Sequence, residues 1–122
     1  MSKKILVVED TEDNRQILRD LLSMAGYDIV EAYDGAEGVA NAAEHKPDLI
    51  LMDIQMPMMD GYEATRRIKA DPALKSIPVI ADTSYALSGD EEKTRAAGCD
   101  GYIAKPFSPR QMLAKVREVL GA

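Results

Sequence analysis

Short apolar runs alternate along this chain with polar turns and with segments of helical periodicity. The runs span residues 4–10, 28–33, 47–54, 77–84 and 101–106. Several of them are continuous rather than alternating, which is typical of parallel strands that are buried on both faces of a sheet. The pattern predicts five such strands. The fourth departs from it, because Asp82 stands where the apolar sequence PVIA should continue.

Helix start signals lie between the apolar runs. Each is a Ser or Asp that precedes a Glu or Gln by three residues, the spacing of a capping box. The four cap residues are Asp34, Asp60, Ser88 and Ser108. A further helix is predicted over residues 12–25, where leucine and isoleucine residues form one apolar stripe. The alternation predicts a doubly wound α/β fold, (βα)5, with helices on both faces of a five-stranded parallel sheet.

The composition fits one compact domain and narrows the classes of function. The chain has 122 residues, with 21 acidic and 15 basic side chains and a net charge of −6. The basic residues form no stripe, and there is no Trp and one Phe, so we expect no nucleic-acid binding, which depends on clustered basic charge and aromatic stacking. No apolar run approaches the ~20 residues of a membrane span, and the single cysteine fits a reducing compartment. We therefore expect a cytoplasmic protein with no membrane segment.

Polar side chains follow the apolar runs at the predicted carboxyl ends of the strands. Ligands of open α/β sheets bind outside that edge, so these side chains are candidates for a shared site. They are Glu9 and Asp10 after the first run, Asp53 in the third, Asp82, Thr83 and Ser84 in the fourth, and Lys105 in the fifth.

These residue types suit phosphoryl chemistry. Crowded carboxylates raise one another's pKa unless a cation neutralises them, and an oxygen-rich acidic site suits Mg²⁺. A carboxylate can also act as a nucleophile and form an aspartyl phosphate. The transition state of that transfer needs positive charge and hydrogen-bond donors. The predicted edge supplies carboxylates, an ammonium group and hydroxyl groups.

Four segments resemble the receiver domain of the response regulators of two-component signalling. They are ILVVEDTEDNR, PDLILMDIQMPMMDGYE, PVIADTSYALSGDEEK and GCDGYIAKPFS. The resemblance covers essentially the whole chain and is greatest to stand-alone receivers of the chemotaxis and cell-division types. It implies a flavodoxin-like (CheY-like) fold with strand order 2-1-3-4-5. It also implies a single receiver domain over residues 1–122, with no output domain in this chain.

The resemblance implies that Asp53 is the phosphoacceptor and part of a metal site. Asp10 and Asp53 would bind the metal directly, and the backbone carbonyl of Gln55 would complete the ligands from the protein. Glu9 would act through a water molecule. The ion would be Mg²⁺, with Mn²⁺ as a possible substitute.

The resemblance also implies which groups bind the phosphoryl group and respond to it. The Thr83 hydroxyl, the Ser84 backbone N–H and the Lys105 ammonium would contact the phosphoryl oxygens, so that Thr83 and Lys105 assist Asp53 in the transfer. The bond between Lys105 and Pro106 would be cis. Tyr102 would turn inward when Thr83 moves towards the phosphoryl group.

The function implied is that of a signalling switch rather than an enzyme. The phosphoryl donor would be a sensor histidine kinase or a histidine phosphotransfer protein. A downstream protein would bind the surface formed by the fourth helix, the fifth strand and the fifth helix, and the chain would be a monomer or a weak dimer. The bulky Tyr85, two residues after Thr83, predicts slow loss of the phosphoryl group.

Two other functions stay open from the sequence. One is a receiver-like binding module that acts without phosphorylation, although the complete set of site residues argues against it. The other is a Mg²⁺-dependent phosphatase that forms an aspartyl phosphate. Such enzymes carry a general acid two residues after the nucleophile, where this chain has Gln55.

Asp82 is a departure from the family pattern, which usually has an aliphatic residue before the threonine. Strand alternation sends Asp82 to the opposite face of the sheet from Thr83, so we expect that it is not a direct metal ligand. An unpaired carboxylate beneath a helix is unfavourable. We therefore expect a hydrogen-bond partner or water near the strand end, and greater stability in an Asp82→Leu variant.

Overall fold

A computed structural model describes residues 3–56, 58–83, 90–105 and 107–121 of the chain. The strands are β1 (Lys4–Val8), β2 (Asp28–Ala32), β3 (Leu49–Asp53), β4 (Val79–Thr83) and β5 (Gly101–Ala104). The helices are α1 (Glu12–Met24), α2 (Gly35–His45), α3 (Gly61–Ala70), α4 (Asp90–Ala97) and α5 (Pro109–Leu120). None of the helices described is long and apolar enough to cross a membrane.

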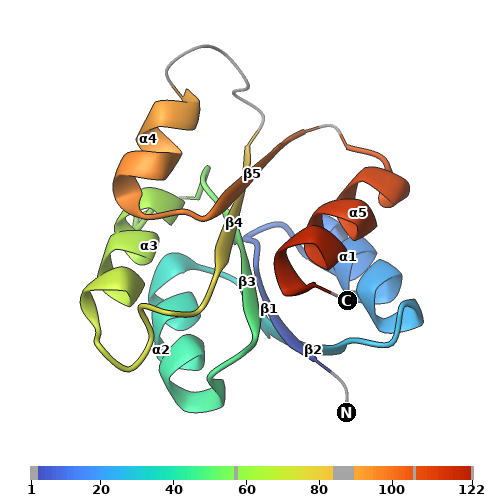
Figure 1. Cartoon of the computed structure of the whole chain (residues 1–122), viewed down its shortest axis with the longest axis horizontal. Coiled ribbons are helices and arrows are strands. Elements are labelled where there is room, and N and C mark those ends of the chain that lie inside the picture. The colour runs from blue at the N-terminus through green and yellow to red at the C-terminus, as the bar shows by residue number, and fades with distance from the viewer. Residues whose placement is uncertain (1–2, 57, 84–89, 106, 122) are drawn as a thin grey trace.

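The strands form one parallel sheet with a helix layer on each face. Their order is β2-β1-β3-β4-β5. Helices α1 and α5 cover one face, and α2, α3 and α4 cover the other (Figure 1). The predicted fold class and strand order are therefore confirmed. The order brings β1, β3, β4 and β5 side by side, so that their carboxyl ends lie along one edge.

Two apolar clusters hold the helices against the sheet. On the α1/α5 face, Ile5, Val7, Leu49, Leu51 and Ile80 of the strands pack with Leu18, Leu22, Met112 and Val116. On the α2/α3 face, Leu6, Val8, Ile50, Met52, Val79 and Ala81 pack with Ala42, Ala64 and Ile68. Alternate residues of a strand thus enter opposite clusters, because successive side chains point to opposite faces. This alternation decides which side chains meet at the strand ends.

Three of the four predicted helix caps are present. The side-chain oxygens of Asp34, Asp60 and Ser108 accept hydrogen bonds from the backbone N–H groups three residues later, at 2.7, 2.9 and 3.1 Å. At Ser108 the box is complete, because its own N–H donates to Gln111 Oε1 at 2.7 Å. Ser88 lies outside the described residues.

A Ser108→Ala substitution removes the side-chain half of this capping box. We expect it to lower the free energy of unfolding by about 1 kcal/mol, because the Gln111 N–H in the first turn of α5 loses its acceptor. Urea unfolding followed by far-UV circular dichroism measures the change. Ser23→Ala, at an exposed site in α1, should stay within about 0.5 kcal/mol of the native chain. Equal effects of the two substitutions would contradict the assignment of the cap.

Candidate functional site

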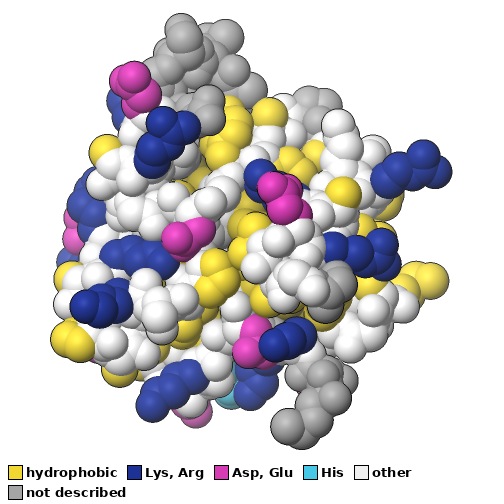
Figure 2. All heavy atoms as spheres, viewed as in Figure 1, with side chains coloured by type: hydrophobic (Ala, Val, Ile, Leu, Met, Phe, Trp, Pro, Cys, Tyr) yellow, Lys and Arg dark blue, Asp and Glu magenta, His cyan; other side chains and the backbone are white. Residues whose placement is uncertain are grey.

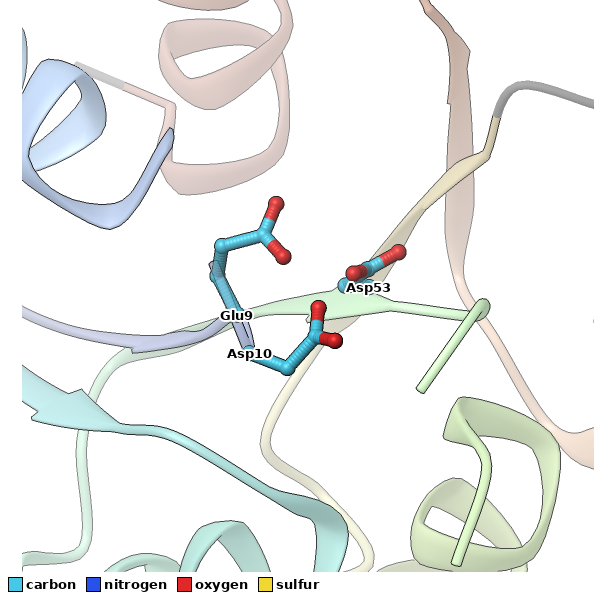
Figure 3. A group of neighbouring side chains, drawn as sticks. All are labelled: Glu9, Asp10 and Asp53. Atoms are coloured by element: carbon cyan, nitrogen blue, oxygen red, sulfur yellow. The ribbon is translucent and has the colours of Figure 1, made fainter. Parts of the chain in front are cut away.

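An acidic cluster lies at the carboxyl edge of the sheet. Glu9 and Asp10 follow β1, and Asp53 ends β3. Figure 3 shows their side chains directed towards a common space, and one carboxylate oxygen from each lies within 4.8 Å of the others. Glu9 and Asp53 are buried, whereas Asp10 is exposed. The cluster therefore reaches from the interior of the sheet to solvent.

Burial raises the pKa of both Glu9 and Asp53 above that of an ordinary carboxyl group. The neighbouring Asp53 adds to the rise in the pKa of Glu9. The neighbouring Glu9 carboxyl group opposes the rise in the pKa of Asp53, and the charge of Asp82 adds to it. A cation among these oxygens would favour their ionised forms. The donor set, carboxylates of which one is open to solvent, fits a hard divalent ion such as Mg²⁺.

The loop after β3 holds the Asp53 carboxylate in place. The Gln55 N–H donates to Asp53 Oδ1 at 3.1 Å, and the Gly61 N–H donates to the Ile54 carbonyl at 3.1 Å. A Cβ atom at Gly61 would lie 2.4 Å from the Asp53 carbonyl oxygen, so this close approach of α3 requires glycine. The loop thus places the Gln55 backbone next to the Asp53 carboxylate. The sequence predicted the Gln55 carbonyl as a metal ligand at this position.

Lys105 brings a positive charge to the buried carboxylates. Its Nζ donates to Glu9 Oε1 at 3.1 Å, and it lies 3.5 Å from Asp53 Oδ1. Its backbone N–H donates to the Thr83 carbonyl at 2.8 Å, which fixes the chain just after β5. Burial lowers the pKa of Lys105, but the charges of Asp82, Asp53 and Glu9 outweigh burial and raise it. Lys105 therefore lies where the sequence predicted it, among the acidic groups.

Asp82 also belongs to this group: the sequence placed it at this edge of the sheet but did not predict its contact with Lys105. In the register of β3 and β4 it lies opposite Asp53, and Ile80 of the same strand packs on the α1/α5 face. Alternation therefore sends Asp82 to that face and Thr83 to the other, as predicted. The same face also carries Asp53, Glu9 and Lys105. Register across the two strands, which is not encoded in the local sequence, was the missing information.

Asp82 is almost completely buried, with the charged Lys105 beside it. The residue is 1% exposed, and its Oδ1 lies 3.2 Å from Lys105 Nζ. The direction of that contact does not make a hydrogen bond, and Oδ1 has no other partner among the residues that the structure describes. We predicted a hydrogen-bond partner or water for Asp82; at Oδ1 the described protein groups supply an ion pair with Lys105 instead of a hydrogen bond. Burial raises the pKa of Asp82 to about 6, Lys105 opposes the rise and Glu9 adds to it.

Thr83 and Tyr102, the two other predicted site residues that the structure describes in these strands, lie on the other face of the sheet. Thr83 is buried at the end of β4. Tyr102 of β5 lies opposite Ala81, so its side chain shares a face with that of Thr83. Ser84 and Pro106 lie outside the described residues. The structure thus places Thr83 and Tyr102 on one side of neighbouring strands.

Arg15 of α1 supports the acidic segment after β1 and was missed by sequence reasoning. Its guanidinium donates to the Glu9 carbonyl at 2.8 Å and to Glu31 Oε1 at 3.3 Å. It also pairs with Glu12. The contacts join α1, β2 and the Glu9 segment, and they depend on tertiary packing that no local motif signals.

Known proteins with similar sequences and structures identify the family. The response regulator receiver domain matches residues 5–117. The polar-differentiation response regulator DivK of Brucella anthropi is 45% identical over 121 residues, which cover 99% of this chain and 98% of that protein.

Two solved structures agree with this match. The receiver domain of the sensor histidine kinase PA1611 from Pseudomonas aeruginosa, with a magnesium ion coordinated in its active-site cleft, is 36% identical with a TM-score of 0.92 over the whole of both chains. The chemotaxis protein CheY4 of Vibrio cholerae is 30% identical with a TM-score of 0.93 over 98% of this chain and 99% of that one. With the strand order and the acidic cluster at the sheet edge, these likenesses show that the chain belongs to the response regulator receiver domain family of two-component signalling.

Proposed function

We propose that Asp53 is the phosphoacceptor of this receiver domain and that residues 1–122 act as one such domain. The donor is a phosphohistidine of a sensor kinase or of a phosphotransfer protein. The observation that carries the proposal is the position of Asp53. Its buried carboxylate lies at the edge of the sheet, 3.5 Å from the Lys105 ammonium and next to the Glu9 and Asp10 carboxylates.

The transfer exchanges one bond to phosphorus for another. A carboxylate oxygen of Asp53 attacks the phosphorus atom while the bond from phosphorus to the histidine nitrogen breaks, and the electron pair of that bond returns to the imidazole. The product is an acyl phosphate on Asp53. Lys105 supplies positive charge beside the phosphoryl oxygens, and Glu9 holds its ammonium by a hydrogen bond.

The acidic cluster is the metal site of the same proposal. Asp10 and Asp53, the Gln55 carbonyl, and Glu9 acting through water would hold Mg²⁺, for which Mn²⁺ can substitute. When bound, the ion neutralises charge on the phosphoryl oxygens. The magnesium in the cleft of the related Pseudomonas receiver supports this assignment.

Thr83 and Tyr102 form the switch, and the surface of α4, β5 and α5 is the output. The Thr83 hydroxyl and the Ser84 N–H bind the phosphoryl group, and Tyr102 responds from the same face of the sheet. A hollow of about 210 Å³ lies at this surface, lined by residues that include Thr94, Tyr102 and Lys115. Both acidic and basic side chains lie on the face drawn in Figure 2, and the net charge of −6 disfavours a nucleic-acid partner. A downstream protein that binds the two states unequally reads the switch.

Labelling with acetyl phosphate and Mg²⁺ tests the proposal. We expect the native chain to gain one phosphoryl group in intact-mass spectra and Asp53→Asn to gain none, because the amide is not a nucleophile. Asp20→Asn, which changes an exposed carboxylate in α1, should label like the native chain. Equal labelling of Asp53→Asn would refute the assignment. Asp82→Asn, which removes the carboxylate next to Lys105, is labelled in parallel. If neither it nor the native chain gains a phosphoryl group, the chain is a binding module that acts without phosphorylation.

A further inference from the structure

The Lys105 ammonium is shared among three carboxylates, and one of them has no role in the transfer just described. Its Nζ lies 3.1 Å from Glu9, 3.2 Å from Asp82 and 3.5 Å from Asp53. The ammonium is therefore nearer to Asp82 than to the phosphoacceptor. Three N–H donors must serve all three acids and, after transfer, the phosphoryl oxygens as well.

Asp82 cannot release Lys105 without loss of its only described partner at Oδ1. That oxygen is buried and makes no hydrogen bond within the part of the chain that the structure describes. An uncompensated charge at such a site is strongly unfavourable. Glu9 and Asp53 differ in this respect, because they lie in the acidic cluster that a divalent ion fits.

We propose that Asp82 is a positioning residue that holds Lys105 back from the phosphoryl group on Asp53 and so keeps the phosphorylated fraction low. The inference rests on the proposed function, because it assumes that Asp53 is the acceptor. Lys105 moves towards the phosphoryl oxygens only by giving up its contact with Asp82 Oδ1. The fixed negative charge of Asp82, opposite Asp53 in the register, also repels the phosphoryl group.

The contact between Asp82 and Lys105 should lower the phosphorylated fraction but raise the affinity of the unphosphorylated chain for a divalent cation. While Asp82 engages Lys105, less of the ammonium's positive charge is directed at Asp53 and Glu9. Their carboxylates and the added charge of Asp82 then attract Mg²⁺ more strongly. Removal of the Asp82 charge should therefore raise phosphorylation and weaken Mg²⁺ binding together. A substitution that merely damaged the fold would lower both.

The test compares Asp82→Asn with the native chain. Phosphoryl occupancy is measured by intact-mass spectrometry over a series of acetyl phosphate concentrations at saturating Mg²⁺. Mg²⁺ affinity is measured separately by NMR titration without a phosphoryl donor. We expect the acetyl phosphate concentration for half occupancy to fall about tenfold and the Mg²⁺ dissociation constant to rise severalfold, as for removal of one nearby charge. Glu44→Gln removes an exposed charge on α2 and should change neither.

Asp82→Leu repeats the test with an apolar side chain, in case the amide of Asp82→Asn disturbs the buried site. Unchanged or lower occupancy in a folded Asp82 variant overturns the inference. Higher occupancy with unchanged or tighter Mg²⁺ binding overturns it too, since the freed ammonium must compete with the ion. Labelling of Asp53→Asn would instead refute the proposed function, so the two failures are distinguishable. A native chain that labels poorly beside an Asp82→Asn chain that labels well on Asp53 would support both proposals.

Discussion

Replacement of Lys105 by methionine is expected to lower the free energy of unfolding by about 3–5 kcal/mol in the presence of a chelator. Removal of one member of a buried ionic group leaves the others uncompensated, and losses of this size are typical. Here three carboxylates share the ammonium, and each is almost fully buried: Glu9, Asp53 and Asp82. Methionine keeps the length and the apolar stem of lysine, so packing changes little. Urea unfolding followed by far-UV circular dichroism measures the loss.

The pH dependence of this loss distinguishes charge from packing. Each of the three carboxyl groups has a raised pKa in the folded chain, and without Lys105 those values rise further. The folded variant then binds more protons than the unfolded chain, so its stability falls as the pH rises from about 5 to 8. A loss that is the same at both pH values would contradict the electrostatic cause. Lys115→Met, which breaks an ion pair with the exposed Glu118, should cost at most about 1 kcal/mol at either pH.

The fold was predictable because its signals are local. Continuous apolar runs indicated buried parallel strands, and the caps at Asp34, Asp60 and Ser108 form the predicted hydrogen bonds. The position of Glu9, Asp53 and Lys105 at one edge followed from strand direction alone. Each of these inferences needs only the order of residues within one element or across one turn.

The part of the site that sequence missed depends on pairing between distant elements. Alternation within β4 correctly separated Asp82 from Thr83. It could not show that Asp82 faces Asp53, because that follows from the register of β3 with β4. Likewise, Arg15 reaches Glu9 and Glu31 only because α1 packs beside β2. The register therefore places the Asp82 carboxylate next to Asp53 and in contact with Lys105, the lysine of the site.

Asp82→Leu is expected to stabilise the protein by roughly 1–3 kcal/mol at pH 7.5. Replacement of buried ionic groups by apolar residues of similar size is often stabilising, and Asp82 Oδ1 lacks a hydrogen bond within the described residues. Lys105 keeps Glu9 and Asp53 as partners after the change, so no new unpaired charge arises. Leucine also extends the apolar cluster that Ile80 joins on the α1/α5 face. Asp82→Asn, which keeps a buried polar group, should gain less.

The gain should depend on pH with a definite sign. The pKa of Asp82 is about 6 in the folded chain and near 3.8 for an ordinary aspartate, so the folded state binds this proton more tightly. The native chain therefore recovers stability as the pH falls from about 7 to 4, whereas Asp82→Leu lacks that contribution. The difference between the two chains should be largest above pH 7 and shrink below pH 5. Thermal and urea unfolding across this range measure it. A large loss of stability in Asp82→Leu at pH 7.5 would show instead that the ion pair with Lys105 is net stabilising and that Asp82 is a well-paired structural group.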